Sequence, residues 1–178
     1  MKGVKRIALL AVCILCMWCG SAMAFTEVQM NDNYSLHELI QRYNDYCKRY
    51  DDNYAEFMLL GSLTRERTTY TPYTTAYSIQ NHLTNILAIF CLNDNGKVVS
   101  FAVIMPKTRS SSDCAEVASR IIRAMNDGHG WEKIYVGCSM ALSTGQIQKV
   151  WSQVDKRYFV FNGESDEEYR LLAFAYVD

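Results

Sequence analysis

The chain has 178 residues, of which 18 are basic and 19 acidic, and nearly half are hydrophobic. This balance of charge excludes a strongly basic nucleic-acid-binding protein, and the two prolines and lack of repetitive tracts exclude a long disordered tail. The length suits a single domain with a substantial core.

The first 24 residues have the organisation of a secretory signal peptide. Three basic residues precede an uninterrupted apolar run of 13 residues (7–19), and the small residues Ala22 and Ala24 then match a leader-peptidase site. The run is shorter than the roughly 20 apolar residues of a spanning helix. We therefore expect cleavage after Ala24, no stable membrane insertion afterwards, and a secreted or periplasmic domain of residues 25–178.

Removal of this leader takes away three basic residues and no acidic ones. The mature chain then has 15 basic residues against 19 acidic ones, a net charge near −4. We expect no nucleic-acid partner for a chain of this charge.

The first predicted element is a helix that begins at Ser35, because Glu38 three residues later completes a capping-box pattern. Apolar residues recur at helical spacing from there to Tyr50. Residues 57–64 then read as a strand. The tyrosine- and threonine-rich stretch 68–78 is predicted as an edge strand or an extended loop, since it contains a proline.

A β-hairpin is the clearest local pattern of the chain. Residues 86–92 and 98–105 are rich in β-formers, and the Asn93–Gly96 segment between them ends in Asn-Gly, which favours the positive φ angles of tight turns.

A second helix is predicted with Ser112 or Asp113 as its N-terminal cap, and it should end before Gly128. Residues 133–140 alternate between apolar and other side chains, which predicts a strand.

Residues 147–154 fit a short helix, with a strand as the alternative. A last hairpin is predicted from residues 157–161 and 169–177, joined by the acidic turn 163–168.

The element order predicts an α+β fold, an antiparallel sheet of β-hairpins with two or three helices packed on one face. Residues 35–105 and 112–177 run through similar series of elements, so two pseudo-repeated halves are a hypothesis, with chance similarity as the alternative.

Four cysteines remain after removal of the leader: Cys47, Cys91, Cys114 and Cys138. An even number in an exported domain favours disulfides. The second helix and the strand predicted to run back from its end cover similar lengths, so Cys114 and Cys138 would lie close together. Cys47 would then pair with Cys91. Four buried thiols are the alternative.

The candidate catalytic sites in the sequence are each incomplete. Cys114 at a helix start, or Cys91, could act as a nucleophile with His82 as the base. The segment around Gly137 and Ser139 has the look of a nucleophile elbow, but Ala141 replaces its second glycine and no histidine follows Ser139. The mature chain shows no metal-ligand spacing and no phosphate-binding glycine loop, so we expect no metal or cofactor.

Tyr70, Tyr73 and Tyr77 are the candidate ligand-binding residues, because tyrosines bury a large area and keep a polar tip. The alternative is a sheet edge that merely favours good β-formers. Together these patterns predict an exported, non-catalytic domain that binds a protein, a glycan or another envelope component. A small cysteine-dependent hydrolase acting on cell-wall or secreted substrates is the alternative.

Overall fold

The computed structural model describes residues 22–25, 34–50, 54–66, 75–125, 131–152 and 157–177. The strands are β1 (Ala22–Phe25), β2 (Thr64–Glu66), β3 (Thr75–Asn81), β4 (Ile86–Leu92), β5 (Val98–Pro106), β6 (Gln148–Ser152), β7 (Arg157–Ser165) and β8 (Tyr169–Val177). The helices are α2 (Leu36–Tyr50), α3 (Tyr54–Phe57), α4 (Ser111–Met125) and α5 (Trp131–Thr144).

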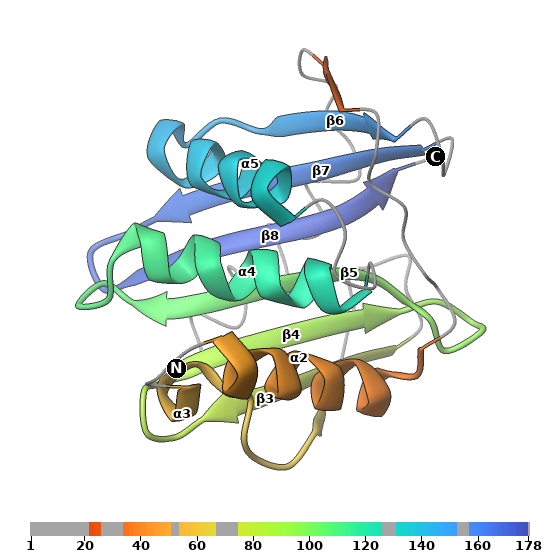
Figure 1. Ribbon diagram of the computed structural model, residues 1–178, viewed down its shortest axis with the longest axis vertical. Coiled ribbons are helices and arrows are strands. Elements are labelled where there is room, and N and C mark those ends of the chain that lie inside the picture. Colours follow the sequence, from red (N-terminus) through yellow and green to blue (C-terminus); the bar gives the residue numbers. More distant parts are fainter. Residues whose placement is uncertain are drawn as a thin grey trace.

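The eight strands form one sheet in the order β1-β6-β7-β8-β5-β4-β3-β2. Strands β2 to β8 pair antiparallel, whereas β1 lies parallel to β6. Helices α2, α4 and α5 lie side by side on one face of this sheet (Figure 1). The predicted α+β class, with helices on one face of an antiparallel sheet, is confirmed.

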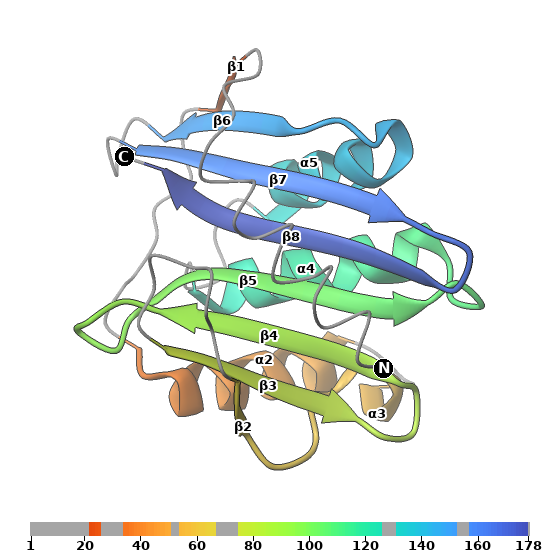
Figure 2. The same cartoon turned by 180° about the vertical axis from the view of Figure 1, so that it is seen from behind.

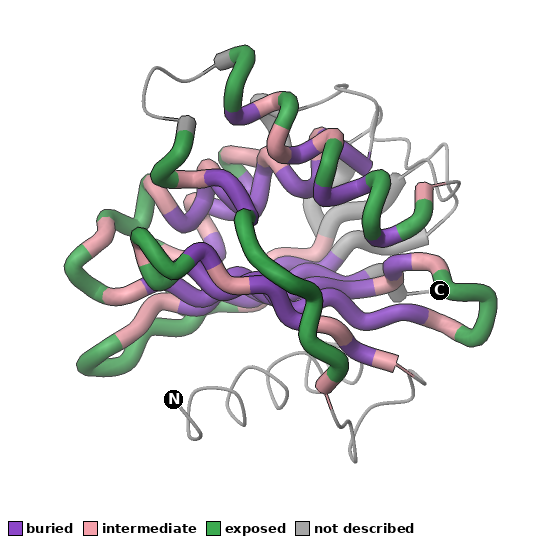
Figure 3. Tube along the Cα trace, turned by 90° about the horizontal axis from the view of Figure 1, so that it is seen from below, coloured by how far each residue is buried: buried purple, intermediate pink, exposed green. Residues whose placement is uncertain are grey.

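The main core lies between the sheet and the helices, which form a separate layer when the molecule is seen from below (Figure 3). Its centre is a row of four phenylalanines that sit directly opposite one another on β4, β5, β8 and β7: Phe90, Phe101, Phe174 and Phe161. Neighbouring ring centroids in this row are 6.1, 5.2 and 5.3 Å apart. Cross-strand aromatic pairs at such distances stabilise the register of the strands that carry them.

The two halves of the sheet meet where β5 pairs with β8, from Ser100 opposite Ala175 to Pro106 opposite Tyr169. From this centre the order is β5-β4-β3 on one side and β8-β7-β6 on the other. Such a mirrored order is what two repeated halves would produce. A common origin of residues 35–105 and 112–177 stays a prediction.

Both long predicted helices are present. At α2 the Ser35 amide donates to Glu38 Oε2 over 2.8 Å, and the Glu38 amide donates to Ser35 Oγ over 3.3 Å, so the predicted capping box is confirmed. At α4 the cap is Ser110, whose Oγ accepts from the Asp113 amide at 3.0 Å. The prediction of a cap at Ser112 or Asp113 is therefore two or three residues too late.

The predicted strand over residues 57–64 is wrong, apart from the start of β2. Helix α3 ends at Phe57, and the chain continues without regular structure to Leu63. Both backbone polar groups of Leu59 bond to the side chain of Asn44, with distances of 2.8 Å for the N–H and 3.0 Å for the C=O. A side-chain amide of α2 thus replaces the neighbouring strand that an apolar extended segment would otherwise need.

Residues 133–140 were predicted as a strand, and this is also wrong, because they lie within α5. Their apolar side chains fit both periods, but Val136 is exposed while Cys138 and Ala141 are buried, which is helical spacing. Small residues let α5 lie very close to β7. A Cβ placed on Gly163 of β7 would be 2.5 Å from backbone atoms of Ala141 and Leu142 at the end of α5.

Three further predictions concern strands. The hairpin of β4 and β5 is confirmed, with Gly96 at a φ of 73° in its turn. The last hairpin is confirmed too, as β7 and β8. Residues 148–152 form strand β6, so the helix predicted over 147–154 is wrong and its alternative is right.

The predicted leader lies outside the described residues, except for residues 22–24 within β1. Across the described ranges, no helix combines the length and the apolar character that crossing a bilayer requires.

Candidate functional site

The candidate site is the face of the sheet opposite the helices, which we call the back face (Figure 2). It carries a second apolar cluster, separate from the main core, with members on β3, β4, β5, β7 and β8. These are Ala76, Leu87, Ile89, Cys91, Ala102, Ile104, Val160, Leu171, Ala173 and Ala175. All ten are buried in the full 178-residue chain. None of the described long helices accounts for this burial, because α2, α4 and α5 all pack on the other face.

The centre of the back face is a shallow floor of short side chains. Ser100 lies opposite Ala175, and Ala102 lies opposite Ala173, across the junction of the two half-sheets. Longer side chains flank this floor, such as Ile89 opposite Ala102 on β4. Short residues in a sheet let another backbone approach closely, so a segment packed on the back face can lie close to the sheet at this floor.

Ser100 is the one polar group at the centre of this floor. Its side chain is completely buried, and its Oγ has no hydrogen-bond partner among the described residues. Ser78, also on the back face, is satisfied because its hydroxyl donates to Glu66 Oε1 over 2.5 Å. A buried hydroxyl without a partner costs about 1–3 kcal/mol. The Ser100 hydroxyl is therefore available to a group that reaches the floor from outside the described elements.

A cavity of about 450 Å³ lies at one end of the back face, beside the turn between β7 and β8. Ile104, Tyr169 and Leu171 connect its wall to the apolar cluster of the back face. The other side is formed by the end of α5 and by the acidic residues Glu164 and Asp166. The volume lies within the range of small-molecule and side-chain pockets, about 300–1,000 Å³.

The two carboxylates of the cavity differ in their surroundings. Asp166 Oδ1 accepts from the amides of Glu168 at 2.8 Å and Tyr169 at 2.6 Å, so this group shapes the turn. Glu164 is exposed and accepts from the side chain of Asn162 at 3.1 Å. The lining of the cavity therefore carries two carboxylates, and the Lys107 ammonium donates to the backbone carbonyl of Asp166 beside them.

Neither a family model, a curated protein nor a solved structure matches this chain.

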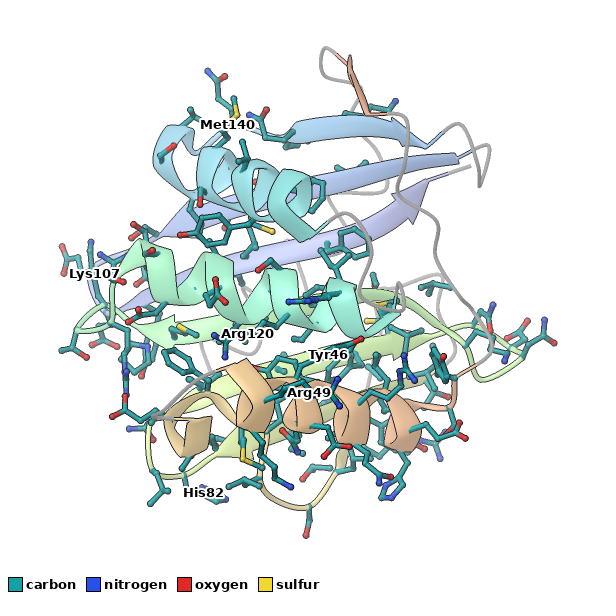
Figure 4. The ribbon with its side chains drawn as sticks, viewed as in Figure 1. Tyr46, Arg49, His82, Lys107, Arg120 and Met140 are labelled. Atoms are coloured by element: carbon teal, nitrogen blue, oxygen red, sulfur yellow. The ribbon has the colours of Figure 1, made fainter. Side chains whose placement is uncertain are left out.

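The structure does not bring the predicted catalytic residues together. Cys114 is buried near the start of α4, and this burial raises the pKa of its thiol to about 12. A nucleophilic cysteine needs the opposite shift. His82 is exposed in the turn before β4, at the margin of the molecule (Figure 4). Cys91 lies near the far end of that strand, about 16 Å beyond Ile86 at roughly 3.3 Å per residue.

None of the four cysteines is joined in a disulfide in the described chain, and all four are buried. The predicted bridge between Cys47 and Cys91 is wrong, because Cys47 belongs to the main core and Cys91 to the back face. Cys138 lies on α5 rather than on a strand. Burial raises the pKa of its thiol, and nearby Cys114 raises it further. Pairing of these two neighbours in the oxidised protein stays a prediction.

The predicted tyrosine surface is only partly described. Tyr77 on β3 is half-buried and packs against the main core on the helix side. Tyr70 and Tyr73 lie outside the described residues, so ligand binding by this stretch stays a prediction. Among the residues described, no three His, Cys, Asp or Glu side chains gather as a metal site would require.

One signal in the sequence could have revealed the back face. Strands β4 and β8 are almost continuously apolar, and the alternating positions of β5 are Ser100, Ala102 and Ile104. Strands that are apolar on both faces are typical of sheets covered on both sides. The two or three predicted helices are enough to cover only one face of the sheet.

Proposed function

We propose that the exported domain is a non-catalytic binding module that holds an apolar helix of a partner polypeptide on its back face. The observation that supports this most is a sheet with apolar side chains on both faces and with its described long helices on one face only. An apolar face of this extent that the described helices leave uncovered is typical of an interaction site.

The form of the partner follows from the floor. A helix buries one apolar stripe against a sheet, which is the usual way in which such layers pack. The short side chains Ser100, Ala102, Ala173 and Ala175 leave room for larger residues of the incoming helix. The hydroxyl of Ser100 would bond to one polar side chain within that stripe, which removes the cost of leaving it buried and unsatisfied.

Charge adds direction to this interaction. The cavity at one end of the back face carries Glu164 and Asp166, and the mature chain has a predicted net charge near −4. A lysine or arginine that follows the apolar stripe of the partner would place its charge at this cavity, and its aliphatic stem would lie along Leu171.

The test uses Cys91 as a reporter of the back face. The protein is expressed with its leader, purified after export, and treated with N-ethylmaleimide without denaturant, and labelled cysteines are located by peptide mapping. We expect Cys91 to react in the processed protein, whereas Cys47, Cys114 and Cys138 stay protected in the main core. Equal protection of Cys91 and Cys114 in the processed protein would show a closed back face and refute the proposal.

Binding itself is tested with the neutral apolar dye N-phenyl-1-naphthylamine. Ala102→Trp fills the floor and should reduce dye binding at least tenfold. Val136→Trp adds the same side chain on the exposed side of α5, at a position 49% exposed, and should leave dye binding unchanged. Should Ala102→Trp not fold, Ala173→Leu fills the same floor with a smaller group. Equal dye binding by all folded variants would place the dye elsewhere and contradict the proposal.

The partner is then identified by a photocrosslinker attached to Cys91. A crosslinked polypeptide whose attached segment is apolar, helical in spacing and flanked by lysine or arginine would support the proposal. A crosslinked glycan or a polar segment would refute it.

A further inference from the structure

Strand β1 occupies one edge of the sheet, next to β6 (Figure 1). The two strands pair in parallel, with Ala22 opposite Lys149, Met23 opposite Val150, Ala24 opposite Trp151 and Phe25 opposite Ser152. This is the only parallel pair in the described sheet. The outer edge of β6 therefore accepts an extended segment in parallel register.

The predicted leader cleavage falls inside this strand. Cutting after Ala24 removes three of the four paired residues of β1 and leaves only Phe25. A single residue cannot maintain a ladder, so β6 becomes the outermost strand of the mature sheet. The backbone N–H and C=O groups that faced β1 then lose their partners.

Strand β6 has few of the features that protect an edge. It is five residues long, contains no proline, and pairs with β7 in continuous register from Gln148 to Ser152. Lys149 is its only charged residue. The opposite edge is different, because β2 has only three residues and two of them, Arg65 and Glu66, are charged. Short, charged edges resist further pairing, whereas a longer and mostly uncharged one invites it.

We propose that leader cleavage converts β6 into the acceptor for an extended strand of a partner protein, which takes the place of β1 in parallel register. The partner strand has small residues at the two positions that Ala22 and Ala24 occupy, opposite Lys149 and Trp151. Main-chain hydrogen bonds supply the affinity, as in other cases of strand addition to a sheet edge. This surface is separate from the back face and requires no occupant there.

The proposal is tested on the processed protein, expressed with its leader and purified after export. Mass analysis must first show a chain that begins at Phe25; a chain that retains residues 1–24 would overturn the proposal at once. The probe is a fluorescent peptide with the sequence of residues 20–27, Gly-Ser-Ala-Met-Ala-Phe-Thr-Glu. We expect it to bind and to slow hydrogen exchange at the amides of residues 148–152 at least tenfold, with no change at residues 64–66 of the opposite edge.

Two N-methylated peptides provide matched controls. One carries methyl groups on the amides of Ala22 and Ala24, and the other on those of Met23 and Phe25. A strand that pairs along one side only uses the amides of alternate residues. One of the two peptides should therefore lose at least tenfold in affinity while the other binds nearly as the parent does. Equal binding by both, or equal loss by both, would contradict strand pairing.

Self-association is distinguished by light scattering of the processed protein without peptide. A monomer whose β6 amides exchange rapidly leaves the edge open to a partner, as proposed. A dimer whose β6 amides are already protected would show that a second copy occupies the edge, and the proposal of a partner strand would be wrong. Neither readout depends on Cys91 or on dye binding, so this proposal and the proposed function can fail separately.

Discussion

The close approach of α5 to β7 allows a sharp test of the fold, through Gly163. A Cβ placed at this position would lie 2.5 Å from the carbonyl carbon and oxygen of Ala141 and from the nitrogen of Leu142. Carbon atoms in good contact are about 3.5–4.0 Å apart, so Gly163→Ala forces the helix and the strand apart by about 1 Å. All three contacted atoms belong to the backbone and cannot rotate away.

Overpacking of this kind costs typically about 1–3 kcal/mol, and contact with backbone atoms places Gly163→Ala at the upper end, near 3 kcal/mol. For a domain of this size, about 1 kcal/mol corresponds to roughly 2–4 °C in Tm. The expected loss is therefore about 6–12 °C, measured by thermal unfolding followed by circular dichroism and checked by urea denaturation.

The matched control is Gly137→Ala on the same interface. Its Cβ would make an ordinary contact of 3.7 Å with the Phe161 ring. Alanine is better than glycine inside a helix by about 1 kcal/mol, so this variant should be as stable as the parent or more so. If Gly163→Ala were within about 0.5 kcal/mol of the parent, α5 would not lie against β7 as described. If Gly137→Ala lost as much stability as Gly163→Ala, the helical assignment of residues 131–144 would be refuted.

Three further predictions concern stability. Ser35→Ala should cost about 1 kcal/mol in urea denaturation through loss of the α2 cap. Hydrogen bonds from Ser35 hold the pKa of Glu38 below its usual value, so the stabilising effect of these bonds is present above the ordinary carboxyl pKa. The difference in stability between variant and parent should shrink as the pH falls through the lowered pKa. Asn81→Ala should cost about 1–3 kcal/mol in the same assay, because the buried Asn81 amide donates to the carbonyl of Met58 at 2.7 Å, and no loss would show that this bond contributes nothing. Cys114→Ala should reduce the loss of stability at high pH, because the buried thiol is neutral in the folded protein. Its contribution is complete below the ordinary thiol pKa of about 8.5 and is lost as the pH rises towards about 12. Identical pH profiles of variant and parent would contradict the burial of this thiol.

Local patterns in the sequence predicted the elements whose geometry depends on near neighbours. The capping box of Ser35 and Glu38, the turn at Gly96 and the run of β-forming residues in β4 all act over a few residues, and each of them is present in the structure. The α+β class followed from the order of these elements. Where local patterns were ambiguous, as at residues 133–140, the burial of Cys138 against other elements decided in favour of a helix.

The candidate sites depended on contacts between distant residues, and the sequence could not supply them. Cys114 and His82 had suitable chemistry, but the packing of α4 buried one while a turn exposed the other. Ser100 and Ala175 are 75 positions apart in the chain, and they form one floor only because β5 and β8 pair at the centre of the sheet.

The sequence by itself determined the α+β class and the capped start of α2, because these depend on composition and on short-range spacing, and the export signal stays a prediction. Only the tertiary structure decided which face of the sheet the helices cover, which strands stand at its edges, and which cysteines share a core. Those features follow from the order and register of eight strands. Such long-range pairings bring together side chains that are far apart in the chain, and the sequence around each of them does not indicate which distant residue it will contact.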